Sequence, residues 1–113
     1  LSLSQEAIVK KKEAERIKKA IGKTSAVIAL DLDGKELDSV GFSEQIHNFM
    51  LDGKSDLAFI IGSSTGLDQS LLRDANFNFC MSKLTFPHQL ARIILLEQIY
   101  RAFKIMNNET YHK

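Results

Sequence analysis

The sequence contains few of the residues that hold a fold together by means other than a packed core. It has one cysteine, one proline and no tryptophan in 113 residues. A lone cysteine, Cys80, cannot form an internal disulfide, which is typical of a reducing compartment, so we expect a cytoplasmic chain. No apolar run reaches the ~18 residues of a membrane-spanning helix. No second histidine or cysteine lies at ligand spacing from His88, and we therefore expect no metal site.

Charged residues nearly balance overall but are unevenly distributed. The formal net charge is +1. Residues 1–23 carry seven basic and three acidic groups, residues 24–74 carry three and nine, and residues 75–113 carry five and two. The basic ends could contact a polyanion, although a run of charge is more often a solvated helix surface.

The apolar patterns predict alternating helices and strands in a single domain, residues 1–113. Apolar runs without polar alternation, at 26–30 and 57–61, are typical of buried parallel strands, and a third strand is expected at 77–81. Such alternation predicts an α/β sheet covered by helices on both faces. The other features we expect are helices at 4–21, 43–53, 68–75 and 87–106, N-caps at Ser4 and Ser43, a turn at Asp33-Gly34, and Pro87 as the first residue of the last helix.

The last predicted helix is too apolar to be a simple surface helix. Its first half carries Leu90, Ile93 and Ile94 on the side opposite its main apolar arc. A helix that is apolar almost all round needs burial on two sides. We expect its own sheet on one side and a second copy of the chain on the other. Arg92 falls within the apolar arc, where a buried guanidinium must form an ion pair across that interface or contact a ligand or RNA.

Two loops follow the carboxyl ends of predicted parallel strands, where ligands bind in open α/β sheets. The first is Gly62-Ser-Ser-Thr-Gly66, whose glycines allow close approach to a ligand. It could equally be a tight turn without a ligand. It also matches the nucleophile elbow of α/β-hydrolases, with Ser64 as nucleophile and His88 or His112 as base, but no acid is clearly placed. The second loop, Met81–Phe86, combines hydroxyls, a lysine and apolar side chains; within it, Thr85 is also a candidate N-cap.

A resemblance to a known family is carried by long stretches of the chain. These are Ser82-Lys-Leu-Thr-Phe-Pro-His-Gln-Leu-Ala-Arg92, Leu96-Glu-Gln-Ile-Tyr-Arg-Ala-Phe103, the Tyr-His-Lys end, Leu57–Gly66 and Ile28-Ala-Leu-Asp-Leu-Asp-Gly34. Together they resemble the bacterial RlmH family, SPOUT-class enzymes that methylate N3 of a pseudouridine in large-subunit ribosomal RNA. Family members have a further strand and helix at the N-terminus, and we expect that segment to be missing here.

The resemblance implies properties that the residue patterns alone do not give. It implies a SPOUT-type parallel sheet flanked by helices with a C-terminal trefoil knot, S-adenosyl-L-methionine as cofactor, and an obligate homodimer. Little net basic charge favours an assembled ribosomal particle over free RNA as the partner. A non-enzymatic relative that binds ribosomal RNA as a dimer is the alternative.

The resemblance also implies roles for particular residues. One position departs from the family pattern, because the family loop usually begins Gly-Gly and this chain has Ser63. That departure motivates the non-enzymatic alternative. The candidate catalytic residues are His112, whose imidazole could remove the N3 proton, and Arg92. The candidate cofactor-binding residues are Leu30, Gly62, Ser63, Gly66, Met81, Ser82, Lys83, Leu84, Thr85 and Phe86. The candidate RNA-binding residues are Arg92, Arg101, Tyr111, His112 and Lys113, although Arg101 could instead pair with Glu97.

Overall fold

The chain forms a parallel three-stranded sheet with helices on both faces. The computed structural model describes residues 2–23, 26–62 and 66–110. Its strands are β1 (Ala26–Glu36), β2 (Leu57–Ile60) and β3 (Phe77–Cys80), in the order β2-β1-β3. Both pairings of β1 are parallel. The sequence-based prediction of a parallel α/β sheet is confirmed.

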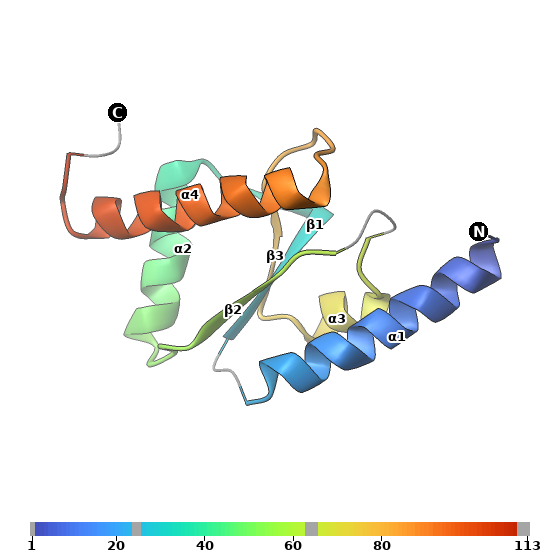
Figure 1. Cartoon of the computed structure of the whole chain (residues 1–113). Coiled ribbons are helices and arrows are strands. Elements are labelled where there is room, and N and C mark those ends of the chain that lie inside the picture. Colours follow the sequence, from blue (N-terminus) through green and yellow to red (C-terminus); the bar gives the residue numbers. More distant parts are fainter. Residues whose placement is uncertain (1, 24–25, 63–65, 111–113) are drawn as a thin grey trace.

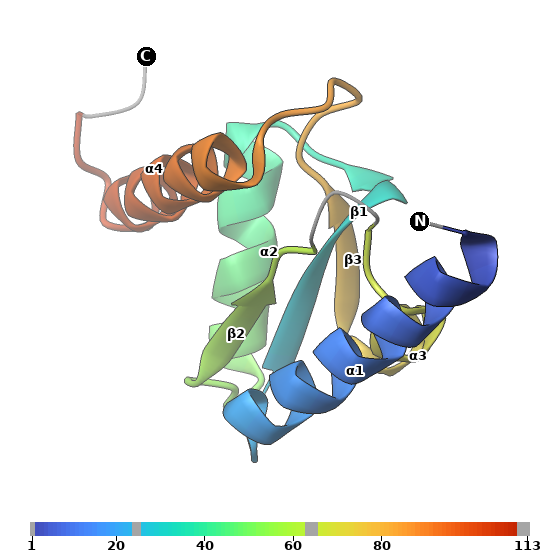
Figure 2. The ribbon, with the colours of Figure 1, turned by 45° about the vertical axis from the view of Figure 1, so that its right-hand side comes forward.

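Each face of the sheet has its own apolar core. Helices α2 (Ser39–Leu51) and α4 (His88–Met106) cover one face, and α1 (Leu3–Ile21) and α3 (Gln69–Asp74) cover the other (Figures 1 and 2). Alternate residues of β1 divide between them, with Ala26 and Ile28 in the first core and Ala29 in the second. This period of two is the geometry of a strand buried on both sides.

Strand β1 is longer than predicted because its pairing with β3 is interrupted and then resumes. Leu30 and Lys35 both align with Phe79, so residues 31–34 form a bulge between them. A side chain at Gly34 would place its Cβ 2.7 Å from the backbone carbonyl of Asn78. Asp33-Gly34 was therefore wrongly predicted to turn the chain: the glycine instead lets the bulge lie against the backbone of β3.

Two predicted helix caps are wrong, and neighbouring polar residues take their places. Helix α1 is capped by Ser2, whose Oγ accepts the Gln5 amide at 3.2 Å. Helix α2 is capped by Asp38, whose Oδ1 accepts the Gly41 amide at 2.7 Å. Ser43 is instead buried within α2, and its hydroxyl donates to the Ala102 carbonyl of α4 at 3.1 Å. That bond joins the two helices on this face of the sheet.

Helix α4 buries one side and exposes apolar residues on the other. Leu95 and Ala102 belong to the first core, and α4 packs beside α2 (Figure 2). Arg92 is exposed in the single chain. Its predicted burial involves a second copy of the chain and stays a prediction. Pro87 is the N-cap, and His88 is the first helical residue. Within the described part of the chain, no helix is long and apolar enough to cross a membrane.

Candidate functional site

The segments predicted to form the site lie at one edge of the sheet. Because the strands are parallel, their carboxyl ends share that edge, with Ala29 beside Ile60 and Leu30 beside Phe79. Gly62 follows β2, and Met81–Phe86 follow β3 on the path to α4 (Figures 1 and 2). The structure thus brings together Leu30, the start of the first loop and the whole second loop. This is the edge at which open parallel sheets bind ligands.

A hydrogen bond joins the start of α4 to the first loop. His88, the first residue of α4, lies with its Nδ1 3.0 Å from the Gly62 carbonyl oxygen. A carbonyl oxygen only accepts, so Nδ1 must carry the proton. The sequence identified both residues but not this contact, because 26 positions separate them.

The second loop is also tied to the β1 bulge. The Lys83 ammonium donates to the Leu32 carbonyl at 2.6 Å and lies 3.8 Å from a Glu36 carboxylate oxygen. Ser82 stabilises the same loop locally, because its Oγ accepts the Leu84 amide at 3.0 Å. Lys83, a predicted cofactor contact, therefore directs its charge toward β1. No sequence pattern predicts this link, because it depends on a bulge that was expected to be a turn.

The predicted cofactor residues differ in exposure. Leu30, Gly62, Met81, Ser82 and Phe86 are half-buried, whereas Gly66, Lys83, Leu84 and Thr85 are exposed. Thr85 does not cap α4, which has no side-chain cap. The half-buried residues offer apolar surface, a hydroxyl and main-chain polar groups, and the exposed ones line the outside of the loop. Such a mixture suits a ligand with both an apolar ring and polar groups.

Gly62 occupies a space that admits no side chain. A Cβ at this position would lie 2.8 Å from the Gly66 carbonyl carbon and 2.9 Å from the Leu67 Cγ. Leu67 is itself buried in the second core. The two ends of the loop therefore lie close together, with Gly62 beside Gly66 and the buried Leu67.

Some predicted site residues lie outside the described part of the chain: Ser63, Ser64, Tyr111, His112 and Lys113. The nucleophile-elbow interpretation depends on Ser64, so it also falls outside that part. The described residues that precede the C-terminal tail are anchored to α4 by Lys104, whose ammonium lies 2.8 Å from the Glu109 carboxylate. Hydrogen bonds to Glu109 and then to Tyr100 raise the pKa of Lys104.

The two arginines of α4 have different surroundings. Arg101 is half-buried, and its Nη2 lies 2.8 Å from the Glu97 carboxylate, one helical turn earlier. This is the alternative that the i,i+4 spacing offered. Arg92 is exposed near the start of α4, on the same helix end as His88.

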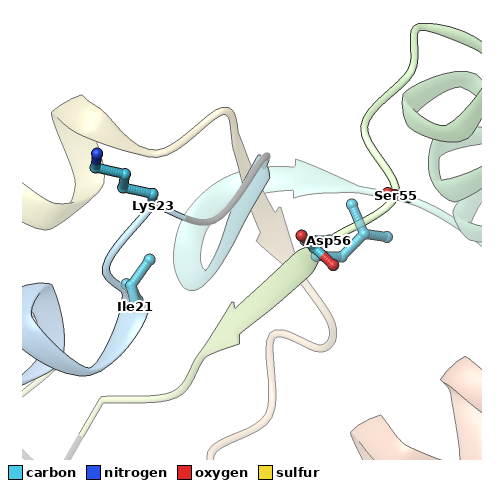
Figure 3. A pocket seen from close by; sticks show the side chains of 5 residues that line it. Ile21, Lys23, Ser55 and Asp56 are labelled. Atoms are coloured by element: carbon cyan, nitrogen blue, oxygen red, sulfur yellow. The ribbon is translucent and has the colours of Figure 1, made fainter.

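A separate hollow lies at the opposite edge of the sheet. It has a volume of about 600 Å³ and is lined by Ile21, Lys23, Ser55, Asp56 and Leu57 (Figure 3). Lys23 and Asp56 do not point toward each other in this view. Leu57 starts β2, so the hollow is at the amino ends of the strands, where parallel sheets do not usually bind ligands. In the part of the chain that is described, no three metal-binding side chains are grouped.

Comparison with known proteins shows the family to which the chain belongs. The family model described as "Predicted SPOUT methyltransferase" matches residues 2–112. A protein of Ruminiclostridium cellulolyticum named "Ribosomal RNA large subunit methyltransferase H" is 59% identical over 113 residues, covering 100% of this chain and 71% of the relative. Proteins of the same name from Clostridium kluyveri and Clostridium botulinum strain Hall are 52% and 54% identical over 112 residues, each covering 99% of this chain and 70% of the relative. The chain therefore belongs to the SPOUT methyltransferases and, within them, to the RlmH family.

Proposed function

We propose that this chain is a methyltransferase that uses S-adenosyl-L-methionine to methylate N3 of a pseudouridine in large-subunit ribosomal RNA. The observation that carries the proposal is identity of 52–59% across the whole chain to proteins named as large-subunit ribosomal RNA methyltransferases. The loops at the carboxyl edge of the sheet support it, because that edge is a general ligand-binding position.

The residues at this edge fit the proposed cofactor. The apolar parts of Leu30, Met81 and Phe86 could contact an adenine ring, and the main chain around Gly62 could hydrogen-bond to polar groups. The absence of a side chain at Gly62 keeps the two ends of this loop close together, because Gly66 and Leu67 fill the space that a side chain would need. The proposed cofactor set is completed by Gly66, Ser63, the half-buried Ser82 and the exposed residues Lys83, Leu84 and Thr85.

When bound, S-adenosyl-L-methionine supplies a methyl group already activated on a sulfonium. The protein must therefore hold the nucleobase in line with that methyl group, exclude water and remove the N3 proton. We propose His112 as the base and Arg92 as a second catalytic candidate. For RNA binding we propose Arg92, Tyr111, His112 and Lys113. We also propose Arg101, for which an RNA phosphate must compete with the Glu97 carboxylate.

We further propose that the chain acts as a homodimer. Helix α4 exposes an apolar stripe, defined as Leu90, Ile93, Leu96, Tyr100 and Phe103, with exposed fractions from 41% to 63%. These residues follow one another at helical spacing and lie away from Leu95 and Ala102, which are buried. A second copy that covers the stripe would remove it from water, which favours association.

A charge in the stripe tests this assembly. Ile93→Glu should shift the protein from dimer to monomer in sedimentation equilibrium. Leu51→Glu is the matched control, because Leu51 is 70% exposed and lies on α2, outside the stripe. An Ile93→Glu protein that remains dimeric would show that another surface forms the dimer.

Three further features belong to the proposal. We propose a C-terminal trefoil knot, supported by family membership and by the contact between the start of α4 and the Gly62 loop. We propose that residues 1–113 act as one domain. We also propose cytoplasmic action on an assembled ribosomal particle, since bacterial ribosomes are cytoplasmic and the chain has little net charge to bind free RNA.

Transfer of a radiolabelled methyl group to ribosomal particles tests the function. The chain should label large-subunit RNA at a pseudouridine, identified by digestion and mass spectrometry. The Ser63→Gly variant should label the same nucleotide and reveals whether the serine lowers cofactor affinity. Particle binding without label in either protein would support the RNA-binding alternative and refute the enzyme.

A further inference from the structure

A group of cations on α1 has no assigned role in the proposed chemistry. Lys12, Arg16 and Lys19, which we call the α1 basic ridge, are all exposed. Their spacing of four and three residues places them on one side of the helix. With a rise of 1.5 Å per residue, the ridge spans about 10 Å. It borders a hollow of about 390 Å³ that also includes Glu15.

The ridge faces away from the core. The opposite side of α1 packs on the second core through Ala14, Ile17 and Ile21. Figures 1 and 2 show α1 on the outside of the molecule, so its far side points away from the sheet. The ridge is therefore accessible along its whole length.

The neighbouring lysines of α1 have contacts that the ridge lacks. The Lys18 ammonium donates to the Ser70 hydroxyl at 3.1 Å. Hydrogen bonds from Ser70 are the main cause that lowers the pKa of Asp68, the N-cap of α3, and the charges of Lys11 and Lys18 lower it further. Across residues 2–23, 26–62 and 66–110, the ion pairs found lie elsewhere, at Lys83–Glu36, Arg101–Glu97 and Lys104–Glu109. The ridge cations are thus left for a partner outside the chain.

We propose that the α1 basic ridge binds the phosphate backbone of the ribosomal RNA substrate, an inference that rests on the proposed function. Charge complementarity selects this partner, because residues 1–23 carry seven basic and three acidic groups while residues 24–74 carry three and nine. The acidic middle of the chain repels a polyanion, so the two basic ends, with α1 the more basic of them, are the parts that face RNA. Arginine and lysine at a helix surface are the usual phosphate contacts, and they give affinity without sequence preference.

The position of α1 connects the ridge to the candidate site. The helix runs antiparallel to β1, the strand that follows it, so its N-terminal end lies toward the sheet edge that carries the loops (Figures 1 and 2). RNA held on the ridge would extend from that edge along the outside of the molecule. The ridge therefore positions a substrate whose target base enters between the loops.

The test removes two ridge charges and compares a matched pair elsewhere. Lys12→Gln with Arg16→Gln changes the middle of α1, where glutamine suits a helix about as well as lysine or arginine. Lys35→Gln with Arg73→Gln removes the same charge from two exposed residues outside α1. Circular dichroism and thermal unfolding should show both double variants folded like the parent chain.

Binding of large ribosomal subunits is measured against salt concentration, together with methyl transfer. Each lost phosphate contact lowers the slope of log affinity against log salt by about 0.7–0.9. For the ridge variant, the magnitude of the slope should therefore fall by about 1.4–1.8 and KM should rise. The control pair should have the slope and KM of the parent. A ridge variant with the parent's slope and KM would overturn the proposal. The same result, and the same conclusion, would follow if another protein segment covers α1.

The two proposals fail in different ways. If the parent chain binds particles but transfers no methyl group, the proposed function fails and the salt slope still decides the ridge. If the parent methylates and the ridge variant binds like the parent, the ridge proposal alone fails. If the parent does not bind the particles, the ridge proposal is overturned.

Discussion

The hydrogen bond between His88 and Gly62 is the contact that most directly connects α4 with the first loop. Its length is 3.0 Å, and the acceptor is a backbone carbonyl, so Nδ1 must be the donor.

Substitutions can separate this bond from the rest of the side chain. In His88→Asn the amide nitrogen lies as many bonds from Cβ as Nδ1 does, so it can donate to the same carbonyl. In His88→Gln the donor is one bond farther along, and in His88→Ala it is absent. A net hydrogen bond contributes about 0.5–1.5 kcal/mol. His88→Ala should therefore bind S-adenosyl-L-methionine about 2- to 10-fold more weakly, and His88→Asn should approach the parent.

Isothermal titration calorimetry with S-adenosyl-L-methionine measures this effect on the full chain, and thermal unfolding serves as the folding control. The expected order of affinity is parent, then Asn, then Gln and Ala. A cofactor Kd in His88→Ala equal to that of the parent would refute a positioning role for this contact. An Asn variant as weak as Ala would show that the ring, and not the Nδ1 donor, is what matters.

Three further predictions concern backbone strain, the core and pH. Gly66 and Gly53 have φ of 83° and 82°, and no atoms lie within 4 Å of where a Cβ would be. Alanine at either position should therefore lower the free energy of unfolding, measured with urea, by about 1–2 kcal/mol. Only Gly66→Ala should also weaken cofactor binding in calorimetry. Phe42 is buried and stacks on Phe79 with ring centroids 4.9 Å apart, so Phe42→Ala should lower the free energy of unfolding by about 3–5 kcal/mol; a loss below 1 kcal/mol would contradict this packing. Hydrogen bonds from Ser70 lower the pKa of Asp68, so its ionised form stabilises α3 above about pH 4 and this contribution disappears as pH falls through the folded-state pKa. The stability advantage of the parent over Asp68→Ala should therefore be larger at pH 6 than at pH 3, and an equal difference at both values would contradict this assignment.

Local patterns predicted the order of elements but not the choice between nearby polar residues. Ser43 and Asp38 are both good N-caps by residue type. The sequence does not show that Ser43 faces α4, where its hydroxyl finds the Ala102 carbonyl. Once that position is buried, the helix must begin earlier, and Asp38 caps it. The error over Gly34 has the same origin, because a glycine needed for contact with Asn78 resembles a glycine needed for a turn.

The candidate site was predictable as a set of segments and not as a set of contacts. Both loops follow apolar runs, and parallel strands place such loops at one edge. The direction of Lys83 toward Leu32 and the bond from His88 to Gly62 join residues 51 and 26 positions apart. No periodicity relates residues so distant. The pattern of a single helix could not predict the exposure of Arg92 in the single chain either. A helical wheel shows which residues share a side of the helix but not what covers that side.

The sequence alone determined the alternation of helix and strand, because buried parallel strands require continuous apolar runs and the helices between them require a 3.6-residue period. It also determined the family, since long stretches with specific side chains rarely match by accident. The tertiary structure decided the bulge in β1, the hydrogen bonds from Lys83 to Leu32 and from His88 to Gly62, and the side of α1 that is exposed to solvent. Those features depend on which surfaces meet, and a surface is assembled from residues that are far apart along the chain.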